Sequence, residues 1–118
     1  MGLRVLIVED NIITREMLKG MLAILGHEVV GEVDNLQDLL AAYKEQKPDV
    51  VTMDLSLPKE DGLTILRALR KSDAAARVVV ISGNSQERII DEIHKAGAAG
   101  LLAKPIQFEA LEKCLASI

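Results

Sequence analysis

Five short apolar runs alternate along this chain with longer segments in which apolar residues recur at helical spacing. Most of the runs contain almost no polar residue, which is typical of strands that are covered on both faces of a sheet. Because each run is followed by a helical segment after only a few residues, the pattern predicts a parallel sheet with helices on both faces. We predict strands at 3–8, 28–33, 49–53, 77–81 and 100–103, and helices at 12–25, 35–47, 61–71, 86–95 and 107–117.

The predicted elements account for the whole chain as one α/β domain, residues 1–118. A length of 118 residues is enough to bury a core and too short for two ordinary domains. Apolar residues make up 49% and charged residues 27%, which places the chain among compact globular proteins. We see no linker, low-complexity tract or internal repeat beyond the strand–helix alternation.

The first predicted helix carries Ile13, Met17, Met21 and Leu25 at four-residue spacing. This spacing forms one apolar stripe, and we expect that stripe to face the core, with the two methionines as filler. Asn11 is expected to cap the start of this helix.

Charge and cysteine content restrict the partners and the compartment. A net charge of -4 and a pI near 5.2 argue against nucleic-acid binding, which needs clustered Lys and Arg. The single Cys114 cannot form an internal disulfide, which favours a reducing compartment. The first apolar run is stopped by acids and resembles neither a signal peptide nor a membrane span. We therefore expect a cytoplasmic protein that binds neither nucleic acid nor membrane.

Polar side chains follow four of the five predicted strands. Glu9 and Asp10 follow the first, Asp54 follows the third, Ser82 the fourth and Lys104 the fifth. The carboxyl ends of parallel strands meet at one edge of a sheet, where ligands bind in open α/β folds. Three converging acids repel one another unless a hard cation neutralises them, and Mg²⁺ fits this donor set best. The alternative for Asp54 alone is an aspartate that merely begins a turn.

The acids after the first strand also exclude related ligands. A flavin or dinucleotide binder would place a Gly-rich or Ser/Thr-rich loop there, so that backbone N–H groups could reach a phosphate. Glu9 and Asp10 put negative charge at that point instead. The pattern therefore indicates phosphoryl chemistry on a carboxylate rather than a bound nucleotide.

Five separated motifs, in order, resemble the receiver domain of bacterial two-component response regulators. They are the run 3–8 with Glu9-Asp10, Asp54 with Pro58, Asp61-Gly62, the run 80–83, and the run 97–105 that ends in Lys104-Pro105. The resemblance covers essentially the whole chain and is closest to stand-alone receivers of the chemotaxis-regulator type. It implies a flavodoxin-like (βα)5 receiver fold, with no output domain in these residues.

The resemblance implies a phosphoacceptor and a metal site. Asp54 would accept the phosphoryl group. Asp10 would bind Mg²⁺ directly and Glu9 through water, with Asp54 and the backbone carbonyl of Ser56 completing the protein ligands. The resemblance also implies that the Lys104-Pro105 bond is cis.

The resemblance further implies a conformational switch. Lys104 would contact the phosphoryl oxygens, and the Ser82 hydroxyl would move toward the new charge. Family members commonly carry Tyr or Phe at the position of Leu101, whose ring turns inward on phosphorylation. Here the signal would travel either through the loop after Ser82 and the helix from Gln86, or through a weaker rearrangement of Leu101. Ser56 and Asn84 occupy positions that influence the lifetime of the phosphoryl group in receivers.

The implied partners are a sensor histidine kinase or phosphotransfer protein as donor and another protein as downstream target. A homodimer formed on phosphorylation is left open. The chain would act only on itself, through slow self-dephosphorylation, and would not be an enzyme. Two alternatives stay open: a Mg²⁺-dependent phosphohydrolase, which would need an Asp at the position of Ser56 and a cap over its substrate, and a degenerate receiver that binds its partner constitutively.

Overall fold

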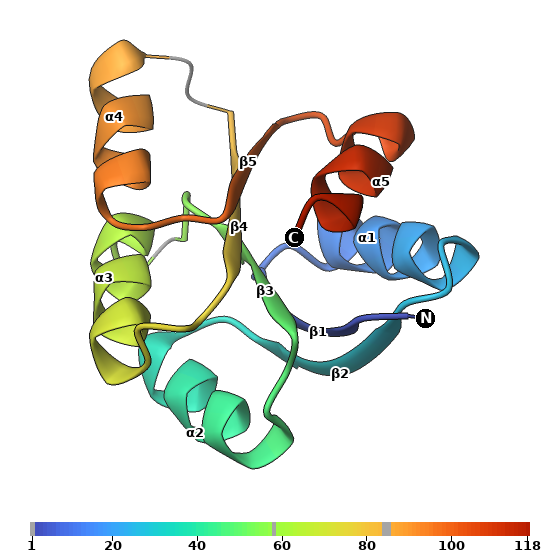
Figure 1. The fold of residues 1–118 in the computed structure, drawn as a ribbon, viewed down its shortest axis with the longest axis horizontal. Helices are drawn as coiled ribbons and strands as arrows, with labels where there is room; N and C mark the ends of the chain where they lie inside the picture. The colour runs from blue at the N-terminus through green and yellow to red at the C-terminus, as the bar shows by residue number, and fades with distance from the viewer. Residues whose placement is uncertain (1, 58, 84–85) are drawn as a thin grey trace.

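The computed structural model describes residues 2–57, 59–83 and 86–118, and it shows one five-stranded sheet with helices on both faces (Figure 1). The elements alternate as the sequence predicts. They are β1 (Arg4–Val8), α1 (Ile12–Ile24), β2 (Glu28–Val33), α2 (Leu36–Gln46), β3 (Val50–Asp54), α3 (Gly62–Ser72), β4 (Val78–Ser82), α4 (Glu87–Lys95), β5 (Gly100–Ala103) and α5 (Phe108–Ala116).

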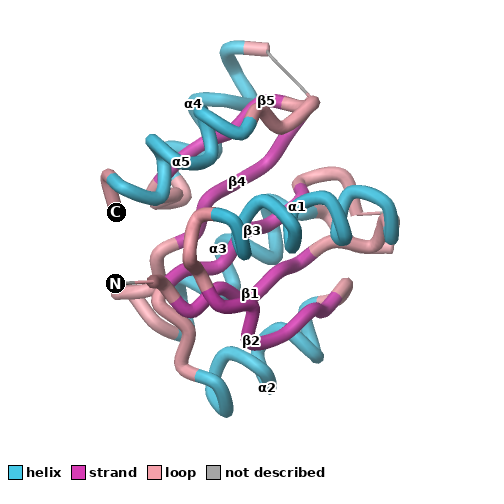
Figure 2. The backbone as a smooth tube through the Cα atoms, turned by 90° about the vertical axis from the view of Figure 1, so that its right-hand side faces the viewer, coloured by secondary structure: helices cyan, strands magenta, loops and turns pink. Residues whose placement is uncertain are grey.

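All strand pairs are parallel, and the order across the sheet is β2-β1-β3-β4-β5. Helices α1 and α5 lie on one face, and α2, α3 and α4 lie on the other (Figure 1). In Figure 2 the strands β2 and β5 stand at opposite ends of the sheet. The direction of winding reverses between β1 and β3, and in such sheets the crevice at the reversal is where ligands bind.

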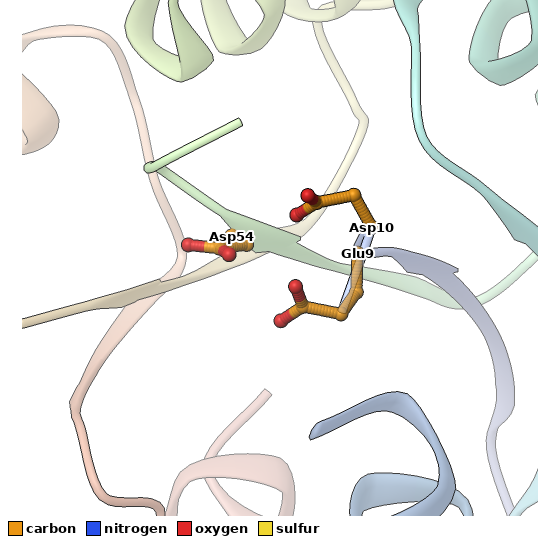
Figure 3. Close-up of side chains that lie close together, drawn as sticks. All are labelled: Glu9, Asp10 and Asp54. Carbon is orange, nitrogen blue, oxygen red and sulfur yellow. The ribbon is translucent and has the colours of Figure 1, made fainter. Parts of the chain in front are cut away.

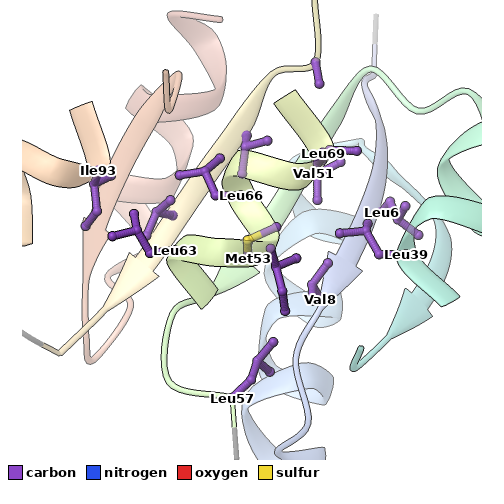
Figure 4. Packing of buried hydrophobic residues seen from close by; sticks show 14 residues of the cluster. Leu6, Val8, Leu39, Val51, Met53, Leu57, Leu63, Leu66, Leu69 and Ile93 are labelled. Atoms are coloured by element: carbon purple, nitrogen blue, oxygen red, sulfur yellow. The ribbon is translucent and has the colours of Figure 1, made fainter. Parts of the chain in front are cut away.

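Each face of the sheet has its own hydrophobic core. Met53 and Val51 of β3 belong to the cluster under α2, α3 and α4, together with Leu66 and Leu69 of α3 (Figure 4). The cluster on the other face contains Val50 and the buried residues of α1 and α5. Successive β3 side chains thus alternate between two buried faces, which explains why the strand sequences are almost continuously apolar.

The predicted core stripe of α1 is wrong in its N-terminal half. Ile13 is 80% exposed and Met17 is 41% exposed, whereas Leu18 and Leu22 are fully buried against the sheet. The C-terminal half of the stripe does pack against the core. Because apolar residues occur almost all the way round this helix, two helical stripes were available. The sheet takes the one that contains the leucines.

Helix α1 begins at the predicted cap residue, and glycines follow the ends of α1 and α4. Asn11 Oδ1 accepts a hydrogen bond from the backbone N–H of Thr14 at 3.0 Å, so it caps α1. Gly26 and Gly97 have φ angles of 85° and 87°, in the left-handed region that glycine adopts without strain after a helix. None of the helices in the described part of the chain is long and apolar enough to cross a membrane.

Thr52 is the one buried side chain in the described residues whose polar atom lacks a hydrogen-bond partner. It is fully buried in β3, in register with Ile7 of β1 and Val79 of β4. Val50, two residues earlier, packs in the cluster that holds both of these neighbours. The Thr52 hydroxyl therefore lies among aliphatic groups, where an unpaired hydroxyl is costly.

We expect Thr52→Val to raise the free energy of unfolding by about 1–2 kcal/mol, because it removes an unpaired buried hydroxyl and keeps the branched shape. The matched control is Val50→Thr, which introduces a hydroxyl on the same face of the same strand and should lower stability by a similar amount. Urea unfolding of the two variants beside the wild type measures both. A stability loss in Thr52→Val would contradict this account.

Candidate functional site

Three carboxylates meet at the carboxyl edge of the sheet, from residues that end two neighbouring strands. Asp54 is the last residue of β3, and Glu9 and Asp10 directly follow β1. One oxygen of each lies within 4.8 Å of the others, and Figure 3 shows the three side chains turned toward a shared space. Glu9 is 2% exposed and Asp54 is 3% exposed, while Asp10 lies at the surface.

Strand register places these acids together. Val8 of β1 pairs with Met53 of β3, so the residues that follow each, Glu9 and Asp54, come side by side at the end of the ladder. The backbone N–H of Glu9 donates to the carbonyl of Val33 at 2.9 Å and continues the β1–β2 pairing by one residue. Backbone hydrogen bonding alone thus fixes the positions of the two Cα atoms from which these side chains extend.

Within the described residues, Asp54 accepts one hydrogen bond at each of its oxygens. Lys104 Nζ donates to Oδ2 at 3.0 Å, and the backbone N–H of Ser56 donates to Oδ1 at 2.9 Å. The Lys104 backbone N–H in turn donates to the carbonyl of Ser82 at 3.1 Å, which anchors the lysine beside β4. A buried carboxylate held by an ammonium group is charge-balanced within the protein. The Lys104-Pro105 bond is cis, as the resemblance implied.

Burial raises the pKa of Glu9 to about 7. A hydrogen bond from the backbone N–H of Asn11, at 3.1 Å, works against this rise, and the neighbouring Asp54 adds to it. Glu9 ionises with difficulty because its charge would be both desolvated and next to a second acid. A hard cation between the oxygens would remove this repulsion, so the donor set fits a small divalent ion such as Mg²⁺.

The serine expected to act in the switch lies at the same edge, whereas Leu101 lies within β5. Ser82 ends β4 and is 3% exposed, and Ile81 before it pairs with Asp54. Leu101 lies in β5, is half-buried, and packs against the cluster under α3 and α4. Pro58 and Asn84 fall outside the described residues.

Sequence reasoning missed one supporting residue. Arg15 Nη1 donates to the carbonyl of Glu9 at 3.3 Å, and Arg15 Nε lies 3.2 Å from Glu32 Oε1 on β2. This arginine ties the first turn of α1 to the end of β1. Nothing in the linear pattern pairs position 15 with position 32, because the contact depends on the packing angle of α1 over the sheet.

A shallow hollow lies beside Lys104. It has a volume of about 370 Å³ and is lined by Thr14, Met17, Lys104, Pro105 and Ile106. A larger hollow of about 630 Å³ lies between the C-terminal ends of α2 and α3, at the opposite edge of the sheet from the acids. Only the smaller one shares a residue with the site.

The comparisons with known proteins agree on one family. A family model described as the response regulator receiver domain matches residues 5–116. The chemotaxis protein CheY of Thermotoga maritima is 41% identical over 117 residues, which cover 96% of this chain and 98% of that protein. CheY of Bacillus subtilis is 39% identical over 119 residues, covering 98% of this chain and 99% of that protein.

Solved structures agree with these relatives. A CheX–CheY–BeF3–Mg²⁺ complex from Borrelia burgdorferi contains a chain that superposes with a TM-score of 0.91 at 28% identity, covering 97% of this chain and 87% of that one. Vibrio cholerae CheY4, crystallised at low pH, superposes with a TM-score of 0.88 at 27% identity and 98% coverage of both chains.

The raised pKa of Glu9 predicts a pH-dependent cost in folding stability without divalent cations. Between the ordinary pKa near 4.5 and the folded value of about 7, the folded state binds more protons than the unfolded state. Stability therefore falls as pH rises through this window, by on the order of 3 kcal/mol for this group. Glu9→Gln should remove that loss and be more stable than wild type at pH 8.

Urea unfolding in EDTA at pH 5, 6, 7 and 8 measures this difference. Gln at position 9 can still accept the hydrogen bond from Asn11. The control is Glu28→Gln, at a surface acid whose side chain is 71% exposed, and its stability should run parallel to wild type. Parallel curves for Glu9→Gln and wild type would contradict the assignment.

Proposed function

The chain belongs to the response regulator receiver domain family, of the CheY type, and on this premise we propose that it is a switch phosphorylated on Asp54. The donor would be a phosphohistidine on a sensor histidine kinase or on a phosphotransfer protein. The output would be altered binding to a downstream protein, with no contact to nucleic acid or membrane. A homodimer formed on phosphorylation belongs to the same proposal, as does a cytoplasmic location.

The pairing of buried Asp54 with Lys104 is the observation that carries this proposal. In the transfer, a carboxylate oxygen of Asp54 attacks phosphorus, the P–N bond to the donor imidazole breaks, and that nitrogen takes up a proton. The Lys104 ammonium, 3.0 Å from Asp54 Oδ2, is placed to follow the negative charge onto the phosphoryl oxygens.

Glu9, Asp10 and Asp54, with the backbone carbonyl of Ser56, are the residues we propose to hold Mg²⁺. When bound, the ion would offset the charge of the carboxylates and of the incoming phosphoryl oxygens. The chain's own contribution is to fix the donors before the ion arrives. Asn11 and Arg15 hold Glu9 through its side chain and backbone, and the Ser56 N–H holds Asp54.

Phosphorylation would then change the surface near β4 and β5. Lys104 is bonded to Asp54 before the transfer, so a larger anion on Asp54 draws both Lys104 and the Ser82 hydroxyl toward it. Leu101 lacks the aromatic ring that family members commonly carry at this position, so we propose that the response runs through the backbone after Ser82 and through α4. Water attack on the acyl phosphate resets the switch slowly, and no second substrate is turned over.

The phosphohydrolase alternative receives less support. The position two residues after Asp54 holds Ser56, which cannot act as the general acid that such enzymes place there. The chain also passes from Asp54 to the start of α3 at Gly62 within a few residues, which leaves no insertion large enough for a substrate cap.

We expect the wild type, incubated with Mg²⁺ and a small-molecule phosphodonor such as acetyl phosphate, to gain the mass of one phosphoryl group that decays after donor removal. Asp54→Asn should gain none, because an amide is not a nucleophile for phosphorus. Intact-protein mass spectrometry follows both. Asp91→Asn, at an exposed acid on α4, is the control and should behave as wild type.

Phosphorylation of Asp54→Asn to the same extent as wild type would overturn the assignment of the acceptor. If the wild type binds Mg²⁺ and still gains no mass from the small donor or from a histidine kinase, constitutive partner binding replaces the switch as the function of this chain.

A further inference from the structure

Arg15 connects the acidic site to β2, a strand that supplies none of the candidate metal ligands. Its Nη1 donates a hydrogen bond to the backbone carbonyl of Glu9 at 3.3 Å, while its Nε lies 3.2 Å from Oε1 of Glu32. A guanidinium group is planar and presents its N–H donors in fixed directions, so one arginine can hold both contacts at once. The end of β1 is therefore linked through α1 to β2.

Glu32 holds this arginine together with a second cation. Its Oε2 lies 3.1 Å from Nζ of Lys19, so each carboxylate oxygen faces a different residue of α1. Arg15 and Lys19 are four residues apart, which places them on the same side of the helix. The side chains of Arg15, Lys19 and Glu32 are only 24%, 34% and 30% exposed. An isolated surface ion pair contributes little, but a partly buried network of three groups restricts the guanidinium more than one pair would.

The backbone of Glu9 is attached to β2 on both sides as a result. Its N–H donates to the carbonyl of Val33 at 2.9 Å, and its carbonyl accepts from the arginine that Glu32 holds. This carbonyl belongs to the planar peptide group that joins Glu9 to Asp10. Holding that plane restricts the directions in which the two carboxylate side chains leave the backbone.

We propose that Arg15 and Glu32 are positioning residues for Mg²⁺ binding, which they strengthen without contacting the ion. This inference rests on the metal site of the proposed function. The carboxylates of Glu9, Asp10 and Asp54 repel one another, and Asp10 lies at the surface, where water competes for its side chain. A peptide plane held by Arg15 keeps the donors in place, so less order has to be gained when the ion binds.

The charge of Arg15 makes this role distinguishable from simple electrostatics. A guanidinium group near a cation site repels Mg²⁺, and the paired carboxylate of Glu32 offsets that repulsion. If Arg15 acted only through its charge, its removal would strengthen Mg²⁺ binding. If it positions the acids, its removal weakens Mg²⁺ binding, so the two accounts differ in sign.

Titration of the backbone amide NMR signals with MgCl2 at constant ionic strength measures the Kd of each variant. We expect Arg15→Gln to weaken Mg²⁺ binding about tenfold, the lower end of the loss that is typical when residues that orient metal ligands are removed. Thermal melts in EDTA show that each variant is folded at the titration temperature. A residue that only stabilised the fold would lower the melting temperature and leave the Kd unchanged.

A double-mutant cycle separates positioning by Glu32 from a general loss of negative charge. Glu32→Ala should weaken Mg²⁺ binding by about three- to tenfold in the wild type. In Arg15→Gln it should add less than about twofold, because its effect passes through the arginine. The matched control is Glu28→Ala, which removes the same charge from the same strand at a side chain that is 71% exposed and pairs with Arg4. Its Kd should stay within about twofold of wild type.

Three outcomes would overturn the inference. Unchanged or tighter Mg²⁺ binding by Arg15→Gln would remove the positioning role of Arg15. Equal losses from Glu32→Ala in both backgrounds, or the same loss from Glu28→Ala, would remove the role of Glu32. In both cases the wild type still binds Mg²⁺ and the proposed function stands. A wild type that does not bind Mg²⁺ would instead overturn the metal site of the proposed function together with this inference.

Discussion

The rest of this site depends on burying a carboxylate at the carboxyl edge of a parallel sheet. Asp54 is 3% exposed, and such a group is tolerated only with a charge partner and hydrogen bonds. Lys104 and the Ser56 N–H supply them. Each comes from the loop after a strand, so the site needs β1, β3 and β5 to end at one edge. The parallel winding and the reversal between β1 and β3 provide that.

The cost of this arrangement is concentrated beside Asp54. Glu9 has a raised pKa because it is buried next to a second acid. Thr52, two residues before Asp54 on β3, has a buried hydroxyl without a hydrogen-bond partner. Glu9 lies at the sheet edge that holds Asp54, and Thr52 lies on the same strand as Asp54. The apolar remainder of the two cores follows the local pattern. Departures from local consistency are expected where function, rather than folding, selects the residue. For Thr52 we have no functional account.

The features of the structure that the sequence predicts are those that depend on local interactions. The elements were predictable because strands buried on both faces are apolar throughout and the helices carry cap residues such as Asn11 and Gly26. It was also predictable that the polar side chains after the strands lie at one edge of the sheet, because parallel strands end at the same edge. These side chains are Glu9, Asp10, Asp54, Ser82 and Lys104. The outward face of α1 was not, since leucines and isoleucines compete for the sheet with equal hydrophobicity. The contact of Arg15 with Glu32 depends on packing angle, which periodicity does not encode.

Helix α1 contacts the acidic site at its start and carries exposed apolar side chains on its outer face. Its first turn is bonded to Glu9 through Asn11 and Arg15, and its outer face carries Met17, which also lines the hollow beside Lys104. Whatever covers Met17 therefore also borders the hollow beside Lys104, the hydrogen-bond partner of Asp54. If Asp54 accepts a phosphoryl group, as we propose, a bulky group on this face of α1 would hinder a large protein donor more than a small phosphodonor.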